Sequence, residues 1–423
     1  MLNSAVVRGL LLDLTPLRGR EFRLLFLGQL VSFFGSMITF VALPFQMYDL
    51  TGSTLAVGAL GICEFVPILA VALVSGALAD AFDRRLLVVF SELGSAVFIA
   101  VLLGNALLDE PQAWVLFVCA AVLAGFYALL RPPLDSLVPR VVPREQLKAA
   151  MALEWVRGNV GMIAGPAIGG VLIAAFGVPL TYGIDLATFL ISLGFLALMR
   201  ASPPPADADA PSLRSIAEGL RYARSRPELL GTYLVDINAM LFGMPQALFP
   251  AIAASYGGAE VLGFLLAAPA VGSLVVALFS GWTRHVHRHG RAVALAATGW
   301  GVAIVAFGFT NVLWLALACL AVAGAMDAIS GLFRSVIWNE TIPDRLRGRL
   351  AGVEMISYTS GPTLGNFEAG ALASLTSVRT SVVSGGVLCV AGTAVLVALL
   401  PAFWRYDARA AAASTSSSSS SSR

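Results

Sequence analysis

The sequence predicts an all-α membrane protein with twelve transmembrane helices, arranged as two parallel-repeat halves of six. The first observation is composition, because 12% of the 423 residues are charged and 58% are hydrophobic, too few charges to cover a water-facing surface. The second is that the apolar stretches are solid runs long enough to cross a bilayer, unlike the short alternating segments of a β-barrel. The third is that Lys and Arg fall almost entirely in every second connection.

The predicted spans divide six and six around the longest polar interruption. They cover residues 22–47, 55–79, 86–108, 112–131, 150–176, 179–200, 229–254, 260–282, 292–311, 313–335, 348–376 and 380–404. We therefore expect five parts: a cytoplasmic N-terminal segment (1–21), an N-terminal six-helix bundle (22–200), a cytoplasmic central loop (201–228), a C-terminal six-helix bundle (229–405) and a disordered, Ser-rich cytoplasmic tail (406–423).

The cations predict the orientation of the chain in the membrane. If the N-terminus is cytoplasmic, 25 of the 27 Lys and Arg residues fall in cytoplasmic segments, including Arg334 at the end of the tenth span. The two others are Arg157, inside the fifth span, and Arg379, in an outer loop. By the positive-inside rule we expect a multi-pass protein of the cell membrane with both termini cytoplasmic.

The two halves resemble each other at an offset of 200 residues, as expected of a parallel repeat. The matching pairs are Cys119 with Cys319, Pro143 with Pro343, and Glu154 with Glu354.

A charged turn, "GALADAFDRRLL" at 76–87, joins the second and third spans. Asp80 is expected to cap the start of the third span, and Arg84 and Arg85 to lie at the inner face of the membrane. Gly76 allows the second span to approach a neighbour closely. The turn resembles the loop signature of the major facilitator superfamily, Gly-x-Leu-Ala-Asp-Arg-x-Gly-Arg-Arg, with Asp83 in place of the usual glycine. The resemblance implies the fold of that superfamily and a latch between its two halves; the alternative is an ordinary positive-inside turn.

The fifth span carries a second signature, "GMIAGPAIGG" at 161–170. It resembles the antiporter pattern of the superfamily's fifth helix, and the matching residues are Gly161, Gly165, Pro166, Gly169 and Gly170. The pattern implies export by exchange, although its further upstream glycine is replaced by Ala152. The alternative is a packing seam, because glycines four apart let helices approach and proline bends them. "SGPTLGN" at 360–366 repeats the theme in the eleventh span.

Longer stretches narrow the resemblance to one branch. The Asp-Arg-Arg ending of the charged turn, "FRLLFLGQLVSFFGSMITFVALPFQMYDLTGSTLAVG" at 22–58 and "LVPRVVPREQLKAA" at 137–150 resemble the branch that contains the enterobactin exporter and related secretion-type carriers. This resemblance implies a secondary transporter.

Acidic residues within the spans are functional candidates, because each costs about 3 kcal/mol at the centre of a bilayer. Candidate proton or substrate sites are Asp236, Asp327, Glu64, Asp185 and Glu368. In the superfamily fold spans one, four, seven and ten line the cavity, which ranks Asp236 and Asp327 first. The alternative for each acid is a structural bond to a neighbouring helix.

Other polar and aromatic residues are candidates for the gate and the cavity. Gate charges are Glu154, Arg157 and Glu354, of which the first two are three residues apart and can pair on one helix face. Cavity candidates are Gln29, Phe33, Tyr127, Asn238 and Gln246. The arginine that many proton antiporters carry within the fourth span is missing here, which puts the usual proton relay in doubt.

These features together predict a secondary active transporter, a proton-coupled exporter of a small organic molecule such as a siderophore, drug or secondary metabolite, working by alternating access. The alternatives are an importer or uniporter of the same fold, or a non-transporting membrane protein. No catalytic constellation or ATP-binding loop is found, so we predict no enzyme and no cofactor. The only histidines, His285, His287 and His289, lie in one turn without acid or cysteine, and we predict no metal site. The expected partners are the small-molecule substrate, protons and the lipid bilayer; we expect no nucleic acid partner, and a monomer.

Overall fold

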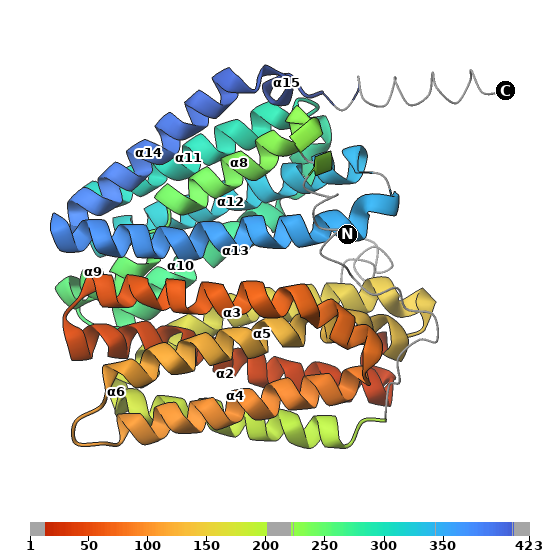
Figure 1. Ribbon diagram of the computed structural model, residues 1–423, viewed down its shortest axis with the longest axis vertical. Helices are drawn as coiled ribbons and strands as arrows, with labels where there is room; N and C mark the ends of the chain where they lie inside the picture. Colours follow the sequence, from red (N-terminus) through yellow and green to blue (C-terminus); the bar gives the residue numbers. More distant parts are fainter. Residues whose placement is uncertain (1–12, 201–220, 223, 343, 408, 410–423) are drawn as a thin grey trace, which may run out of the picture. The chain divides into compact units, whose positions relative to one another are not determined.

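The computed structural model describes residues 13–200, 221–222, 224–342, 344–407 and 409 (Figure 1). The side chains at 73, 76–77, 79–80, 344–349 and 351–356 are not part of that description. Most of the predicted N-terminal segment, central loop and tail therefore lie outside the described residues, as do the side chains of Asp80 and Glu354. The regular structure of the described part is helical, as predicted.

The chain divides into two compact units. Unit 1 comprises residues 1–43 and 70–211, and unit 2 comprises residues 44–69 and 212–423. The first two long helices, α2 (Arg20–Thr51) and α3 (Thr54–Ala81), are each divided between the units, with one part in unit 1 and the other in unit 2. Unit 1 also contains α4 (Arg84–Ala106), α5 (Ala113–Val141) and α6 (Leu147–Ala197), and α4 packs against both α5 and α6.

The long helix α6 is two helices joined at Gly177. This residue has φ 80° and ψ 172°, a backbone conformation that favours glycine because it has no Cβ. The two parts, 147–176 and 178–197, correspond to the predicted spans 150–176 and 179–200.

Unit 2 contains the remaining long helices. They are α8 (Pro227–Phe242), α9 (Phe249–Tyr256), α10 (Ala259–Leu278), α11 (His289–Phe309), α12 (Leu313–Thr341), α13 (Asp344–Leu375) and α14 (Val378–Leu399), followed by the short α15 (Pro401–Trp404). Helix α12 packs against α10 and α11, and α8 against α13 and α14.

Ten helical segments in the described part of the chain are long and apolar enough to cross a membrane. One of them, Arg144–Ala197, contains the two helices that meet at Gly177. Helix α13 is not among the ten, although it occupies the predicted range 348–376. A multi-span helical architecture is thus established.

The predicted seventh span, 229–254, corresponds to the candidate membrane span Pro227–Tyr256, but the helix within it is interrupted between α8 and α9. Gly243 ends α8, and Pro245 has no N–H to continue the hydrogen-bond ladder. The freed backbone groups find partners within unit 2. Trp300 Nε1 donates to the Gly243 carbonyl at 3.0 Å, and the Ala247 N–H donates to Asn366 Oδ1 at 2.9 Å. Broken helices are tolerated in a membrane only with such partners.

Candidate functional site

Unit 2 contains a cluster of two acids around one arginine, which we call the unit 2 charge cluster: Asp236, Asp327 and Arg334. Arg334 of α12 forms an ion pair with Asp236 of α8, and their side chains are only 10% and 5% exposed. A second guanidinium nitrogen of Arg334 lies 3.7 Å from Asp327, whose side chain is 42% exposed. The hydroxyl of Ser357 donates to the other oxygen of Asp236 at 3.3 Å. The structure therefore brings together the two acids that the sequence ranked first.

The charge balance of this cluster is uneven. With every group ionised, two carboxylates share one guanidinium, so the cluster carries a formal charge of about −1 in a site that is largely buried. Asp327 is the more exposed and the more loosely held of the two acids. It is therefore the carboxylate best placed to accept a proton or a cationic group of a substrate.

The sequence counted Arg334 among the cytoplasmic cations at the end of the tenth span and did not predict its pairing with the two acids. Helix α12 continues to Thr341 and does not end at 335 as predicted, so about 10 Å of helix follow Arg334. The signal that identifies it is spacing, because Asp327 lies seven residues earlier and hence on the same helix face.

Unit 1 contains an ion pair between Glu154 and Arg157 on α6, which we call the unit 1 charge pair. Arg157 Nη2 lies 2.7 Å from Glu154 Oε2, and Nε donates to the same oxygen at 2.8 Å. Arg157 also donates to the main-chain carbonyl of Gln29 at 3.3 Å, and its guanidinium lies over the ring of Phe33, 5.3 Å from the centroid. Two predicted gate charges and two predicted cavity residues thus meet at one place.

The other candidate acids lie elsewhere. Asp185 of α6 is fully buried. Its carboxylate accepts hydrogen bonds from Thr39 of α2 and from Thr188 of α6. Glu64 of α3 and Glu368 of α13 are half-buried, and within the described part of the chain no hydrogen bond or ion pair involves either of them.

The remaining cavity candidates have varied surroundings. Asn238 is buried and turned toward α14, where it donates to Cys389 O at 2.9 Å and to Thr393 Oγ1 at 3.2 Å. Tyr127 is half exposed beneath the guanidinium of Arg131. Gln246 lies in the interruption between α8 and α9.

The glycines of the fifth-span signature line a seam between α6 and α2. A side-chain carbon at Gly161 would meet the ring of Phe33, and one at Gly165 would meet Met37. Gly169 lies against the main chain of Ile38, and Pro166 and Gly170 are buried beside them. Helices α13 and α8 repeat this seam, since Gly361 and Gly365, at the offset of 200, both lie against Met240. The geometry supports close helix packing at the signature.

The charged turn after α3 caps the next helix with a different acid from the one predicted. Asp83 is the N-cap of α4, and its side chain accepts hydrogen bonds from the main-chain N–H groups of Arg85 at 2.8 Å and Leu86 at 3.4 Å. Asp80 lies before the cap, inside α3, because that helix continues to Ala81. The predicted capping role of Asp80 is therefore wrong.

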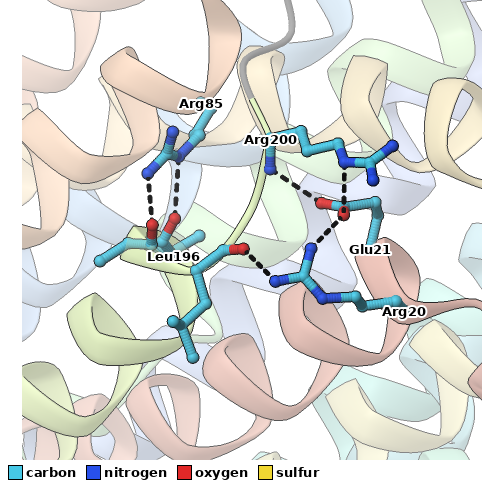
Figure 2. Close-up of polar contacts among 7 residues, drawn as sticks. Arg20, Glu21, Arg85, Leu196 and Arg200 are labelled. Carbon is cyan, nitrogen blue, oxygen red and sulfur yellow. Dashed lines mark hydrogen bonds and ion pairs between the residues drawn. The ribbon is translucent and has the colours of Figure 1, made fainter.

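Arg85 of the same turn binds the end of α6 (Figure 2). Its guanidinium donates to the carbonyls of Leu196 and Ala197, both at 2.8 Å, and Arg20 donates to the carbonyl of Leu198 at 2.8 Å. These carbonyls lie at the C-terminal end of α6, where cations are favourable. Figure 2 also shows Glu21 between Arg20 and Arg200. The carboxylate of Glu21 accepts hydrogen bonds from the guanidinium of Arg20 and from the main-chain N–H of Arg200, both at 2.9 Å. Arg84 is buried, and the side chain of Asp80 lies outside the description.

One buried acid in the membrane-spanning helices was missed. Glu92 lies in α4 and is 0% exposed. Gln29 Nε2 and Ser32 Oγ, both from α2, donate to its Oε1. The signal was present in the sequence, because Glu92 falls inside the predicted third span, 86–108.

Comparisons with known proteins agree on the kind of protein. The family profile described as transmembrane secretion effector matches residues 12–419. The enterobactin exporters EntS of Shigella boydii serotype 18 and Citrobacter koseri are each 31% identical to the chain, with 92% of this chain and 94% of the relative covered.

The solved structures that resemble the chain share its fold at low identity. The nucleoside transporter NupG has a TM-score of 0.68 at 13% identity, covering 90% of this chain and 98% of that one. A bacterial homologue of the iron transporter ferroportin, in an inward-facing state, has a TM-score of 0.65 at 19% identity, again covering 90% and 98%.

Proposed function

Because the chain belongs to the transmembrane secretion effector family of major facilitator transporters, we propose that it exports a small organic molecule by alternating access, driven by the proton gradient. It is a transporter and not an enzyme. Export is supported by the relatives named enterobactin exporter, which also make a siderophore or a related metabolite the first cargo to test.

The observation that carries the coupling proposal is the unit 2 charge cluster. Two ionised carboxylates and one guanidinium leave one negative charge unbalanced, and the binding of one proton neutralises it. Movement of one charge through 100 mV supplies about 2.3 kcal/mol, which is enough to bias a transport cycle. This arrangement provides an acid–base site in a chain whose predicted fourth span has no charge until Arg131 at its inner end.

Everted membrane vesicles test the proposal. Energised vesicles containing the wild-type protein should accumulate the cargo, and a protonophore should abolish the accumulation. Asp327→Asn and Asp236→Asn should lose the gradient-driven component. Glu260→Gln, which changes an exposed acid in the first turn of α10, is the control and should transport normally.

Other outcomes would contradict parts of the proposal. If the cargo equilibrates across the vesicle membrane without energisation, the protein is a uniporter. If energised everted vesicles release the cargo, the protein is an importer. Unchanged transport and pH dependence in both Asn variants would remove the cluster from coupling.

We propose that both termini are cytoplasmic, with the protein in the cell membrane as a monomer. Single cysteines can be introduced into 201–228 and probed with a reagent added to the outside of intact cells. If the reagent labels them, the proposed cytoplasmic orientation is contradicted.

A further inference from the structure

Glu92 is surrounded by neutral hydrogen-bond donors. It lies about two turns into α4, fully buried, with the amide of Gln29 and the hydroxyl of Ser32 on one carboxyl oxygen, the hydroxyl at 3.1 Å. Ser192 from the second part of α6 borders the same carboxyl. None of these three groups can neutralise a negative charge.

The charged groups on the neighbouring helices are engaged elsewhere or exposed. On α6 they are Lys148, which is exposed, Arg157, which is paired with Glu154, and Asp185, which is bound by two threonines. On α5, Arg131, Asp135 and Arg140 are exposed. The charges of α2 lie outside its middle section, and those of α4 itself are at its start.

A bare carboxylate at this position is therefore unfavourable. Within the residues that the structure describes, no cation forms an ion pair with Glu92. Burial of an ionised carboxylate without a paired cation costs several kcal/mol, whereas a protonated carboxyl is neutral and needs only ordinary hydrogen bonds. The surroundings of Glu92 suit the protonated acid.

Gln29 connects this acid to the unit 1 charge pair. Its side-chain amide donates to Glu92, while its main-chain carbonyl accepts from Arg157. Gln29 therefore contacts both Glu92 and the cation Arg157. Arg157 in turn forms the ion pair with Glu154, with a distance of 2.7 Å between its Nη2 and Glu154 Oε2. If Glu92 loses its proton, the new buried anion competes with Glu154 for Arg157.

We propose that Glu92 is a proton-binding site of unit 1 and that its protonation controls the Glu154–Arg157 pair. The ligand is a proton exchanged with water, and no covalent bond other than the O–H bond changes. Proton binding stands on the geometry of unit 1 alone; only its use in transport rests on the proposed function.

Infrared difference spectroscopy of the purified full-length protein in lipid nanodiscs tests proton binding directly. The wild type should show a pH-dependent carbonyl stretch of a protonated carboxylic acid that is missing in Glu92→Gln and present in the control Glu260→Gln. The Gln variant keeps the size and hydrogen bonds of a protonated Glu, so it should fold. Identical spectra for wild type and Glu92→Gln would overturn the proposal, and Glu92→Asp, which keeps a carboxyl, should retain a shifted band.

Vesicle transport tests the link to coupling. Glu92→Gln should lose gradient-driven accumulation while retaining cargo counterflow, which needs no net proton movement. If the wild type and Glu92→Gln show equal gradient-driven accumulation of cargo, the link between Glu92 and coupling is overturned. Absence of gradient-driven transport in the wild type would instead reject the proposed function, and the infrared result would still decide whether Glu92 binds a proton.

Discussion

Removal of Arg334 should destabilise the protein far more than removal of the exposed acid beside it. In Arg334→Met, Asp236 stays 5% exposed and keeps only the hydroxyl of Ser357, at 3.3 Å, as a partner. Deletion of one member of a buried ion pair costs about 3–5 kcal/mol, because the other charge is left uncompensated. At 1.4 kcal/mol per factor of ten, this lowers the ratio of folded to unfolded protein roughly 10²- to 4 × 10³-fold.

Asp327→Asn should behave differently. Asp327 is 42% exposed and 3.7 Å from the guanidinium, so its loss should cost about 0–1 kcal/mol, as for a surface pair. The double variant Arg334→Met with Asp236→Asn removes both buried charges and should recover most of the stability lost in Arg334→Met.

The assay is heat inactivation of purified protein in detergent, followed by the fraction that remains monodisperse. Because such unfolding is irreversible, the rank order of half-lives at one temperature is the quantity to compare. Arg226→Met, which removes a half-exposed arginine from a 3.5 Å pair with Glu228, is the matched control. The reasoning is refuted if Arg334→Met survives as long as Arg226→Met, or if adding Asp236→Asn shortens its half-life further.

Three further predictions concern the helices around the charged groups. Asp83→Ala should cost about 0.5–2 kcal/mol of stability through loss of the α4 cap, measured as a lower midpoint of heat unfolding, and Asp83→Asn should retain most of the cap. Gly165→Leu should prevent close packing against Met37, costing about 1–3 kcal/mol or more, and should lower the yield of folded protein in fluorescence size-exclusion profiles; a normal profile would contradict the seam. Trp300→Phe should leave the Gly243 carbonyl without its donor and increase proteolysis between α8 and α9, at a cost of about 1–3 kcal/mol, whereas unchanged proteolysis would show that this bond does not hold the interruption together.

The sequence predicted the helices well because crossing a bilayer requires a fixed length of apolar residues. The turn at Gly177 was located within a few residues, since "GVP" combines a glycine that allows positive φ with a proline that cannot continue the ladder. The interruption at Gly243 carries a similar pair of residues, but they are surrounded by apolar residues. Its stabilisation depends on Trp300 and Asn366, which are distant in sequence.

The candidate site was only partly predictable. Acids in the spans were conspicuous, yet the helices are apolar on nearly all sides, so their rotation about their own axes could not be read from the sequence. For that reason Arg334 was not predicted as the partner of Asp236. Glu92 could have been found, because its position inside a predicted span was sufficient reason to include it.

The glycine seams limit how this protein can be stabilised for study. Replacement of glycine by alanine is a common way to stiffen a membrane protein, since it restricts the unfolded chain. At Gly161, Gly165, Gly361 and Gly365 even one added methyl group meets a neighbouring helix, so this strategy would separate the helices it was meant to fix. Gly104, Gly183 and Gly194 have open space around them and are the better positions to engineer.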